Sequence, residues 1–122
     1  METRRVLVVE DEALLAMELA RIVADVTAAK PVMADTVRAA RHAVRNTKID
    51  LAVLDISLPD GTAFEVADYL LQQGTPYMFV TALDRSTIPL RHRAAPVVSK
   101  PFGESDVRVA LTSVLGAMRR SS

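Results

Sequence analysis

With 122 residues, half of them hydrophobic and a quarter charged, the chain has the size and composition of one globular domain with a single core. Fifteen basic and fifteen acidic residues cancel to zero formal charge, which argues against nucleic acid as a direct partner. No cysteine is present for disulfide or thiol chemistry, and His42 and His92 lack the spacing of a zinc site. The charged N-terminus is unlike a signal peptide and no apolar run could span a membrane, so we expect a cytoplasmic protein.

The first part of the chain alternates between apolar runs and helical patterns. Residues 6–9 are continuously apolar and predict a strand buried on both faces. The run 31–34 predicts a short strand, and Pro31 at its start suits the edge of a sheet. Asp35 or Thr36 can cap the helix that follows. The inward positions of the two predicted helices are Leu15, Leu19, Ile22, Val23 and Val26 in the first, and Val37, Ala40 and Val44 in the second, with His42 on the outer side.

The central part of the chain is organised around the apolar run 51–54, which ends at Asp55. A loop follows over 56–61, and we expect residues 60–62 to open the next helix. Gly74 suits the C-cap of that helix. Its predicted inward residues are Ala63, Val66, Ala67, Leu70 and Leu71.

The last part of the chain predicts two more strands and a final helix. Residues 76–80 form the fourth strand, which ends at Thr81, and 96–99 form the fifth. Between them, residues 82–95 contain Pro89 and little amphipathic regularity, so we expect a short or broken helix there. The final helix has its predicted inner face at Val107, Leu111, Val114, Leu115 and Met118.

This alternation of strands and helices predicts an α/β fold with a parallel five-stranded sheet. Right-handed crossovers place helices on both faces, which gives a flavodoxin-like (βα)5 three-layer sandwich with strand order 2-1-3-4-5. Residues 1–122 show no linker, repeat or low-complexity segment, so we expect a single domain over the whole chain.

Acidic side chains follow two strands that this order makes neighbours. Glu10 and Asp11 come after the first strand and Asp55 after the third, so the three should converge at the carboxyl edge of the sheet. Clustered carboxylates attract a hard cation, and Mg²⁺ is satisfied by one or two carboxylates, a carbonyl and water. The sequence therefore predicts a magnesium site.

Thr81 and Lys100 follow the fourth and fifth strands and should reach the same edge. An ammonium and a hydroxyl beside a cation site can neutralise and hydrogen-bond the oxygens of a phosphoryl group. Taken singly, each of these residues has an ordinary structural explanation as a cap, a turn residue or an exposed loop residue. Their shared position points to phosphoryl transfer onto a carboxylate.

Four segments resemble the sequence motifs of response-regulator receiver domains, in the same order and spanning essentially the whole chain: residues 6–12, 54–61, 79–82 and 99–102. The resemblance implies a phosphorelay protein of a two-component system, phosphorylated on Asp55 by a histidine kinase or histidine phosphotransfer protein. It also implies a signalling domain rather than a classical enzyme, although it can dephosphorylate itself. Its signal passes to a downstream protein partner, with no direct contact to nucleic acid or membrane.

The resemblance also implies a role for each site residue. Asp11 and Asp55 would bind Mg²⁺ directly, with the backbone carbonyl of Ser57 as a third ligand and Glu10 acting through water. Lys100 would pair with the phosphoryl oxygens, and Thr81 would move to hydrogen-bond them. The bond before Pro101 is typically cis in the family. We expect Lys100 to gain a strong partner only once the phosphoryl group is present.

The chain departs from the common receiver pattern in two places. Val97 stands where most receivers carry an aromatic residue, three positions before the lysine, and the segment between Thr81 and Lys100 is short and contains Pro89. The stretches 76–81 and 96–102 resemble an atypical receiver subgroup with a Phe-Ala-Thr signature after a Pro-Phe pair, although this chain has Phe79-Val80-Thr81-Ala82 without the Gly and Tyr expected next.

Other functions remain open at this point. The chain could be an unphosphorylated pseudo-receiver scaffold, although the site residues are intact. It could be a small phosphatase of the haloacid-dehalogenase type, although that class has a second Asp where this chain has Ser57. A flavin-binding flavodoxin is disfavoured because three acids after the first strand would repel phosphate. Four residues follow Met118, and the sequence does not distinguish a stand-alone regulator, a phosphate sink and part of a longer protein.

Overall fold

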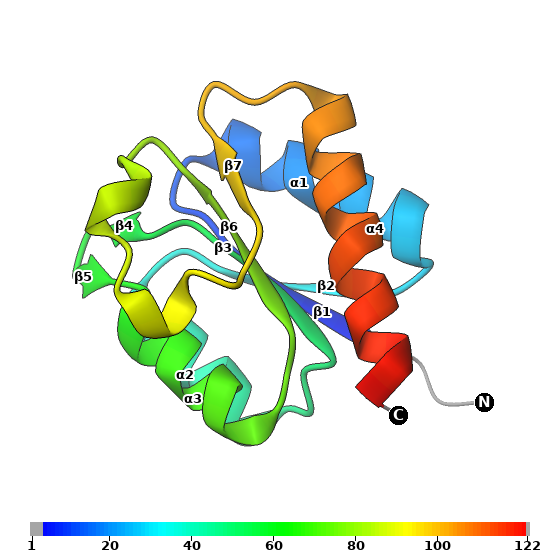
Figure 1. Cartoon of the computed structure of the whole chain (residues 1–122), viewed down its shortest axis with the longest axis horizontal. Helices are drawn as coiled ribbons and strands as arrows, with labels where there is room; N and C mark the ends of the chain where they lie inside the picture. The colour runs from blue at the N-terminus through cyan, green and yellow to red at the C-terminus, as the bar shows by residue number, and fades with distance from the viewer. Residues whose placement is uncertain (1–3, 122) are drawn as a thin grey trace.

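The fold is a parallel five-stranded sheet in the order β2-β1-β3-β6-β7, with a separate two-stranded hairpin, β4-β5 (Figure 1). The computed structural model describes the backbone of residues 4–121 and the side chains of residues 4–117. The five sheet strands confirm the predicted flavodoxin-like order 2-1-3-4-5. The elements are β1 Arg5–Val9, α1 Ala13–Thr27, β2 Lys30–Ala34, α2 Val37–Asn46, β3 Leu51–Leu54, β4 Ser57–Leu58, β5 Gly61–Thr62, α3 Phe64–Gln73, β6 Tyr77–Thr81, the 3₁₀ turns η1 Arg85–Thr87 and η2 Leu90–His92, β7 Val97–Ser99 and α4 Glu104–Ser121.

Two apolar layers enclose the sheet, one on each face. Successive residues of a strand point to opposite faces, so Val6 and Val8 of β1 join one core while Leu7 and Val9 join the other. The first core includes side chains of α1 and α4, and the second includes side chains of α2 and α3. All four residues of β3 have no exposed surface, which explains why that strand is continuously apolar.

The ends of the helices mostly follow the predicted chemistry. The Thr36 hydroxyl caps α2 by accepting from the Ala39 N–H at 3.0 Å. Gly74 adopts a left-handed conformation with φ of 72° and ends α3, as predicted. Within the described side chains one inward assignment is wrong: Leu71 is 49% exposed, because it lies at the edge of the buried face of α3. The Met118 side chain lies outside the described part of the chain.

The segment predicted to open α3 forms a hairpin instead. Ser57–Leu58 and Gly61–Thr62 pair as antiparallel strands β4 and β5, and α3 begins only at Phe64. The residue before the helix, Ala63, makes no side-chain cap. Gly61 has φ of 143°, a conformation that glycine adopts more readily than other residues. Glycine at this position therefore favours the hairpin over a helix start.

The fourth crossover, from Ala82 to Ala95, contains two 3₁₀ turns in place of an α-helix, in agreement with the broken helix that Pro89 predicted. Arginine side chains tie this crossover to backbone carbonyls. Arg85 donates to the Val97 carbonyl at 2.9 Å, and Arg93 donates to the Ile88 carbonyl at 3.0 Å. The Arg85 bond joins the crossover to β7, and the Arg93 bond lies within the crossover.

His92 anchors the end of this crossover in the core, where it is 1% exposed. Its Nε2 lies 2.6 Å from an Asp68 carboxylate oxygen, and its Nδ1 contacts the Tyr77 hydroxyl. One neutral tautomer satisfies both contacts, with Nε2–H donating to Asp68 and Nδ1 accepting from Tyr77. The imidazole ring also stacks on the Phe64 ring, with a distance of 6.2 Å between the ring centroids and an interplanar angle of 9°. The network therefore buries a polar ring without leaving a ring nitrogen unsatisfied.

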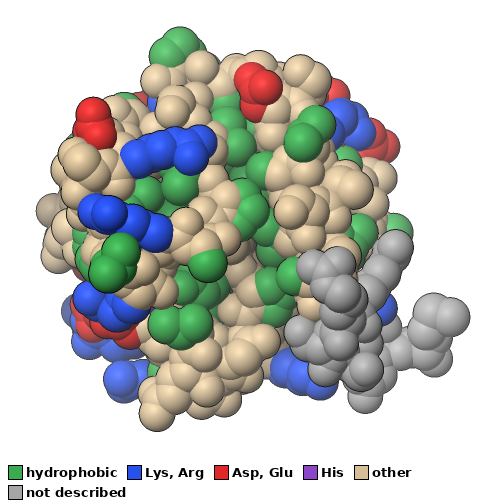
Figure 2. All heavy atoms as spheres, viewed as in Figure 1, with side chains coloured by type: hydrophobic (Ala, Val, Ile, Leu, Met, Phe, Trp, Pro, Cys, Tyr) green, Lys and Arg blue, Asp and Glu red, His purple; other side chains and the backbone are tan. Residues whose placement is uncertain are grey.

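The short crossover leaves a groove of about 410 Å³ beside α4, whose lining includes Tyr77, Arg91 and Val114. Figure 2 shows this side of the molecule, with exposed hydrophobic side chains between flanking charged ones. Among the helices of residues 4–121, none combines the length and the apolar character needed to cross a membrane.

We predict that Tyr77→Phe lowers the free energy of unfolding by about 1–3 kcal/mol, because the buried Nδ1 of His92 loses its hydrogen-bond donor. Urea unfolding followed by circular dichroism measures this loss. Tyr69→Phe is the matched control, since no hydrogen bond from the described residues reaches the partly buried Tyr69. Equal stability of the Tyr77 and Tyr69 variants would show that the network contributes nothing to the fold.

Candidate functional site

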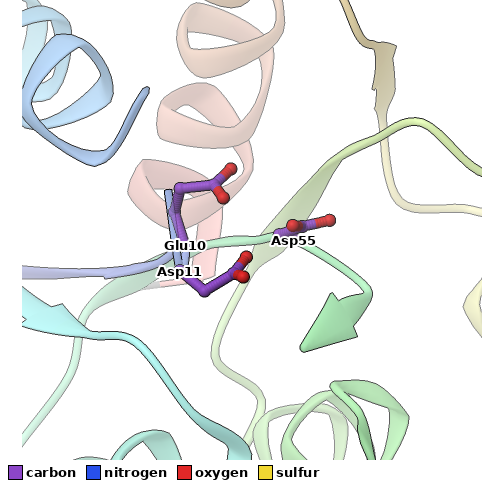
Figure 3. Close-up of side chains that lie close together, drawn as sticks. All are labelled: Glu10, Asp11 and Asp55. Atoms are coloured by element: carbon purple, nitrogen blue, oxygen red, sulfur yellow. The ribbon is translucent and has the colours of Figure 1, made fainter. Parts of the chain in front are cut away.

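Three acidic side chains meet at the carboxyl edge of the sheet. The Asp55 N–H donates to the Val9 carbonyl at 2.9 Å, which aligns the ends of β3 and β1. Glu10, Asp11 and Asp55 each offer a carboxylate oxygen, and these oxygens all lie within 4.8 Å of one another. Figure 3 shows the Glu10 and Asp11 side chains projecting from the end of β1 toward Asp55. The sequence-based expectation that these residues converge is therefore correct in geometry.

The three acids differ in burial. Glu10 is 2% exposed and Asp55 is 5% exposed, whereas Asp11 faces solvent. The second Glu10 oxygen, Oε2, accepts from the Glu12 N–H at 3.0 Å. The site thus consists of two buried carboxylates and one that is open to exchange with water and ions.

Lys100 already contacts both buried acids. Its Nζ lies 2.6 Å from Glu10 Oε1 and donates to Asp55 Oδ2 at 3.0 Å. The expectation that Lys100 gains a strong partner only with a phosphoryl group is wrong. β7 pairs in parallel with β6, and β6 pairs with β3. This order places Lys100, directly after β7, within reach of the negative charges of Glu10 and Asp55.

The pKa values of this pair reflect burial and mutual attraction. Burial raises the pKa of the Glu10 carboxyl, although Lys100 and the Glu12 N–H act in the opposite direction. For Lys100, burial acts to lower the pKa, and the opposing attraction of Glu10 and Asp55 outweighs it, so the pKa lies above its ordinary value. Lys100 is therefore a fixed positive charge across the physiological pH range.

Thr81 ends β6 and is fully buried. Its carbonyl accepts from the Lys100 N–H at 2.9 Å, which joins the end of β6 to the start of the lysine loop. Its hydroxyl accepts from the Leu83 N–H at 3.2 Å. Thr81 therefore connects the edge of the sheet to the first residues of the fourth crossover.

Ser57 lies in β4, directly after the loop that follows Asp55. The Ala63 N–H donates to the Ile56 carbonyl at 2.9 Å, so these residues form a hydrogen-bonded pair of the antiparallel ladder. Hydrogen-bonded and non-bonded pairs alternate along such a ladder, and Ser57 opposite Thr62 is consequently a non-bonded pair. The Ser57 carbonyl is thus not consumed by the hairpin.

The sequence analysis did not predict the contacts of two residues, Asp60 beside the site and His92 away from it. The Asp60 carboxylate accepts from the backbone N–H groups of Val37 and Arg38, instead of opening α3. His92 is buried, although the sequence analysis assigned it no role. The partners of these two residues are 15 to 24 positions away in the sequence, so no local pattern could have shown these contacts. The Lys100-Pro101 bond is cis, in agreement with the resemblance.

Comparison with known proteins places this geometry in a family. The family model for the response regulator receiver domain matches residues 6–112. The sensory transduction protein LytT of Enterococcus faecalis is 34% identical over 106 residues, which are 84% of this chain and 44% of that protein. The chain therefore spans less than half the length of this relative.

Comparison with solved structures agrees with this family assignment. The receiver domain of PhyR from Erythrobacter litoralis is 29% identical with a TM-score of 0.81, over 95% of this chain and 92% of that one. SdrG from Sphingomonas melonis Fr1 is 35% identical with a TM-score of 0.76, over 94% of this chain and 99% of that one. The chain belongs to the response regulator receiver domains of two-component signal transduction.

Proposed function

We propose that this receiver is phosphorylated on Asp55 by a histidine kinase or histidine phosphotransfer protein in the cytoplasm, and that the phosphorylated form signals by binding a downstream protein. The observation that supports the proposal best is the buried Asp55 carboxylate, held at 3.0 Å by Lys100 beside two further acids. A carboxylate oxygen in this position can act as a nucleophile, with a cationic group ready to receive the negative charge of the incoming phosphoryl group.

The donor set fits Mg²⁺. Asp11 and Asp55 supply carboxylate oxygens, the Ser57 carbonyl is free of the hairpin ladder, and buried Glu10 is close enough to act through water. Three hard oxygen donors suit an octahedral cation better than zinc, which prefers nitrogen and sulfur. When bound, the cation supplies positive charge to the oxygens of the phosphoryl group.

The other steps of phosphoryl transfer depend on three side chains of the protein. An Asp55 oxygen attacks the phosphorus of the donor phosphohistidine; the new O–P bond forms as the P–N bond breaks, and the electron pair returns to the imidazole of the donor. The Lys100 ammonium is in place to pair with a phosphoryl oxygen, because its Nζ already contacts Asp55. The Thr81 hydroxyl would donate to another phosphoryl oxygen.

We predict that incubation with acetyl phosphate and Mg²⁺ adds the mass of one phosphoryl group, and that Asp55→Asn abolishes the addition because the nucleophilic carboxylate is gone. Intact-mass spectrometry measures both. Asp35→Asn removes an exposed acid at the end of β2 and serves as the control that should still be labelled. Labelling of the Asp55 variant, or full labelling in excess chelator, would overturn the proposal.

We predict that Asp11→Ala weakens Mg²⁺ binding and yet stabilises the metal-free protein by about 1 kcal/mol, because it removes one of three neighbouring negative charges. Among the described residues, no hydrogen bond or ion pair to the Asp11 side chain opposes this gain. Thermal unfolding with and without chelator measures it, and Asp35→Ala is the control. A lower metal-free Tm for the Asp11 variant contradicts the repulsion argument.

We predict that Lys100→Met lowers the free energy of unfolding of the metal-free protein by about 3 kcal/mol near neutral pH, because two buried acids lose their cation. The loss should shrink as the pH falls. Burial holds the pKa of folded Glu10 above its ordinary value of 4.5, so the native state binds the proton more tightly than the unfolded chain does. Protonation of Glu10 in the window above pH 4.5 therefore relieves the variant.

Urea unfolding of the Lys100 variant and the wild type at several pH values measures this difference. Lys48→Met, which replaces an exposed lysine outside the site, controls for the change in net charge. The Lys100 variant should also bind Mg²⁺ more tightly, since one competing cation is gone. A stability loss that grows toward low pH would show that Lys100 acts through packing and not through charge.

A further inference from the structure

The Asp60 carboxylate joins the loop after Asp55 to the start of α2. It lies in the two-residue turn of the β4-β5 hairpin, and its Oδ1 accepts from the Val37 N–H at 2.7 Å. Its Oδ2 accepts from the Arg38 N–H at 3.0 Å. The hydrogen bond from Val37 holds the pKa of the Asp60 carboxyl below its ordinary value. One side chain thus makes two charge-assisted hydrogen bonds to another element.

These bonds complete the first turn of α2. A helix leaves its first N–H groups without intrahelical partners. Here Thr36 accepts from the Ala39 N–H, and Asp60 accepts from the two N–H groups before it. Thr36 and Asp60 therefore cap the same helix end, but only Asp60 comes from the loop that carries Ser57.

The Asp60 contact also closes a ring of hydrogen bonds around the acidic site. The Glu10 N–H donates to the Ala34 carbonyl at 3.0 Å, which ties the site to the end of β2 just before α2. The Asp55 N–H donates to the Val9 carbonyl at 2.9 Å, which ties the site to β3. The Asp60 carboxylate closes the ring, because it accepts from Val37 at the start of α2 and so joins this helix to the hairpin that follows Asp55.

We propose that Asp60 is a positioning residue for the cation and phosphoryl site: its two bonds to the N-terminus of α2 fix the β4-β5 hairpin, and with it the Ser57 carbonyl, relative to Asp55. This inference rests on the proposed function, in which that carbonyl is a cation ligand. Asp60 does not itself contact the cation. It restricts the hairpin so that the carbonyl does not have to be ordered when the cation binds.

The test compares two caps of the same helix. Asp60→Ala and Thr36→Ala both remove acceptors from the first turn of α2, and only the first releases the hairpin. Mg²⁺ affinity is measured for each by NMR titration of backbone amides, with urea unfolding as the measure of stability. We expect Asp60→Ala to weaken Mg²⁺ binding by roughly ten-fold or more, and Thr36→Ala to leave it unchanged. Asp60→Asn, which keeps one acceptor oxygen, should fall between wild type and Asp60→Ala.

Amide hydrogen exchange of residues 57–62 without metal provides a second measurement. Exchange should increase in Asp60→Ala and not in Thr36→Ala. If the wild type binds Mg²⁺ and is labelled on Asp55, but the two Ala variants bind Mg²⁺ equally, the positioning role is wrong and the proposed function stands. If the wild type neither binds Mg²⁺ nor is labelled, the proposed function fails. In that case, amide hydrogen exchange of residues 57–62 still tests whether Asp60 fixes the hairpin. Equal exchange rates in Asp60→Ala and Thr36→Ala would show that Asp60 does not fix it.

Discussion

The excess of negative charge at the carboxyl edge of the sheet is the constraint to which the rest of the site responds. Glu10 and Asp55 are buried there, Asp11 adds a third carboxylate, and Lys100 is the ammonium that contacts both buried acids. Three acids and one lysine leave an imbalance of two negative charges in a partly desolvated crevice. Such an imbalance is unfavourable for folding, and under the proposed function the same feature favours the binding of a divalent cation.

Fixed backbone hydrogen bonds keep these charges together. The backbones of Glu10 and Asp55 are held close together, because the Glu10 N–H donates to Ala34 and the Asp55 N–H donates to Val9, which ties the ends of β1, β2 and β3. Both strands that carry the acids are buried on both faces, and moving either one would disturb the two apolar cores. Packing in the layers therefore supplies the energy that holds like charges in place.

Those parts of the structure that depend on local pattern could be predicted from the sequence. Continuous apolar runs identified β1, β3 and β6, and acids at the ends of β1 and β3 identified the site, because both follow from short-range periodicity and the topology of parallel sheets. Contacts between distant segments could not be predicted in the same way. Lys100 could be placed at the correct edge, but the distance to Glu10 depends on side-chain packing that no periodicity encodes.

The misassigned residues show the same limit. Asp60 before Gly61 is compatible both with a helix start and with a hairpin turn, and the N-terminus of α2, 23 residues earlier, stabilises the hairpin. Leu71 fits the apolar pattern of α3, yet its exposure is decided by what lies next to that helix. Leu71 lines the groove beside α4, where its side chain remains exposed.

The fourth crossover carries this reasoning one step further, because its two halves are held differently. Residues 82–87 are all exposed, and hydrogen bonds link them to the sheet: the Leu83 N–H donates to the Thr81 hydroxyl, and the Arg85 side chain donates to the Val97 carbonyl. From Ile88 onward, buried Ile88 and His92 fix the chain to the core through Asp68 and Tyr77. The weak amphipathic regularity of this segment predicted a short or broken helix but did not distinguish its two halves. The structure instead places the weakly held part directly after Thr81, and Pro89 lies between the two buried anchors.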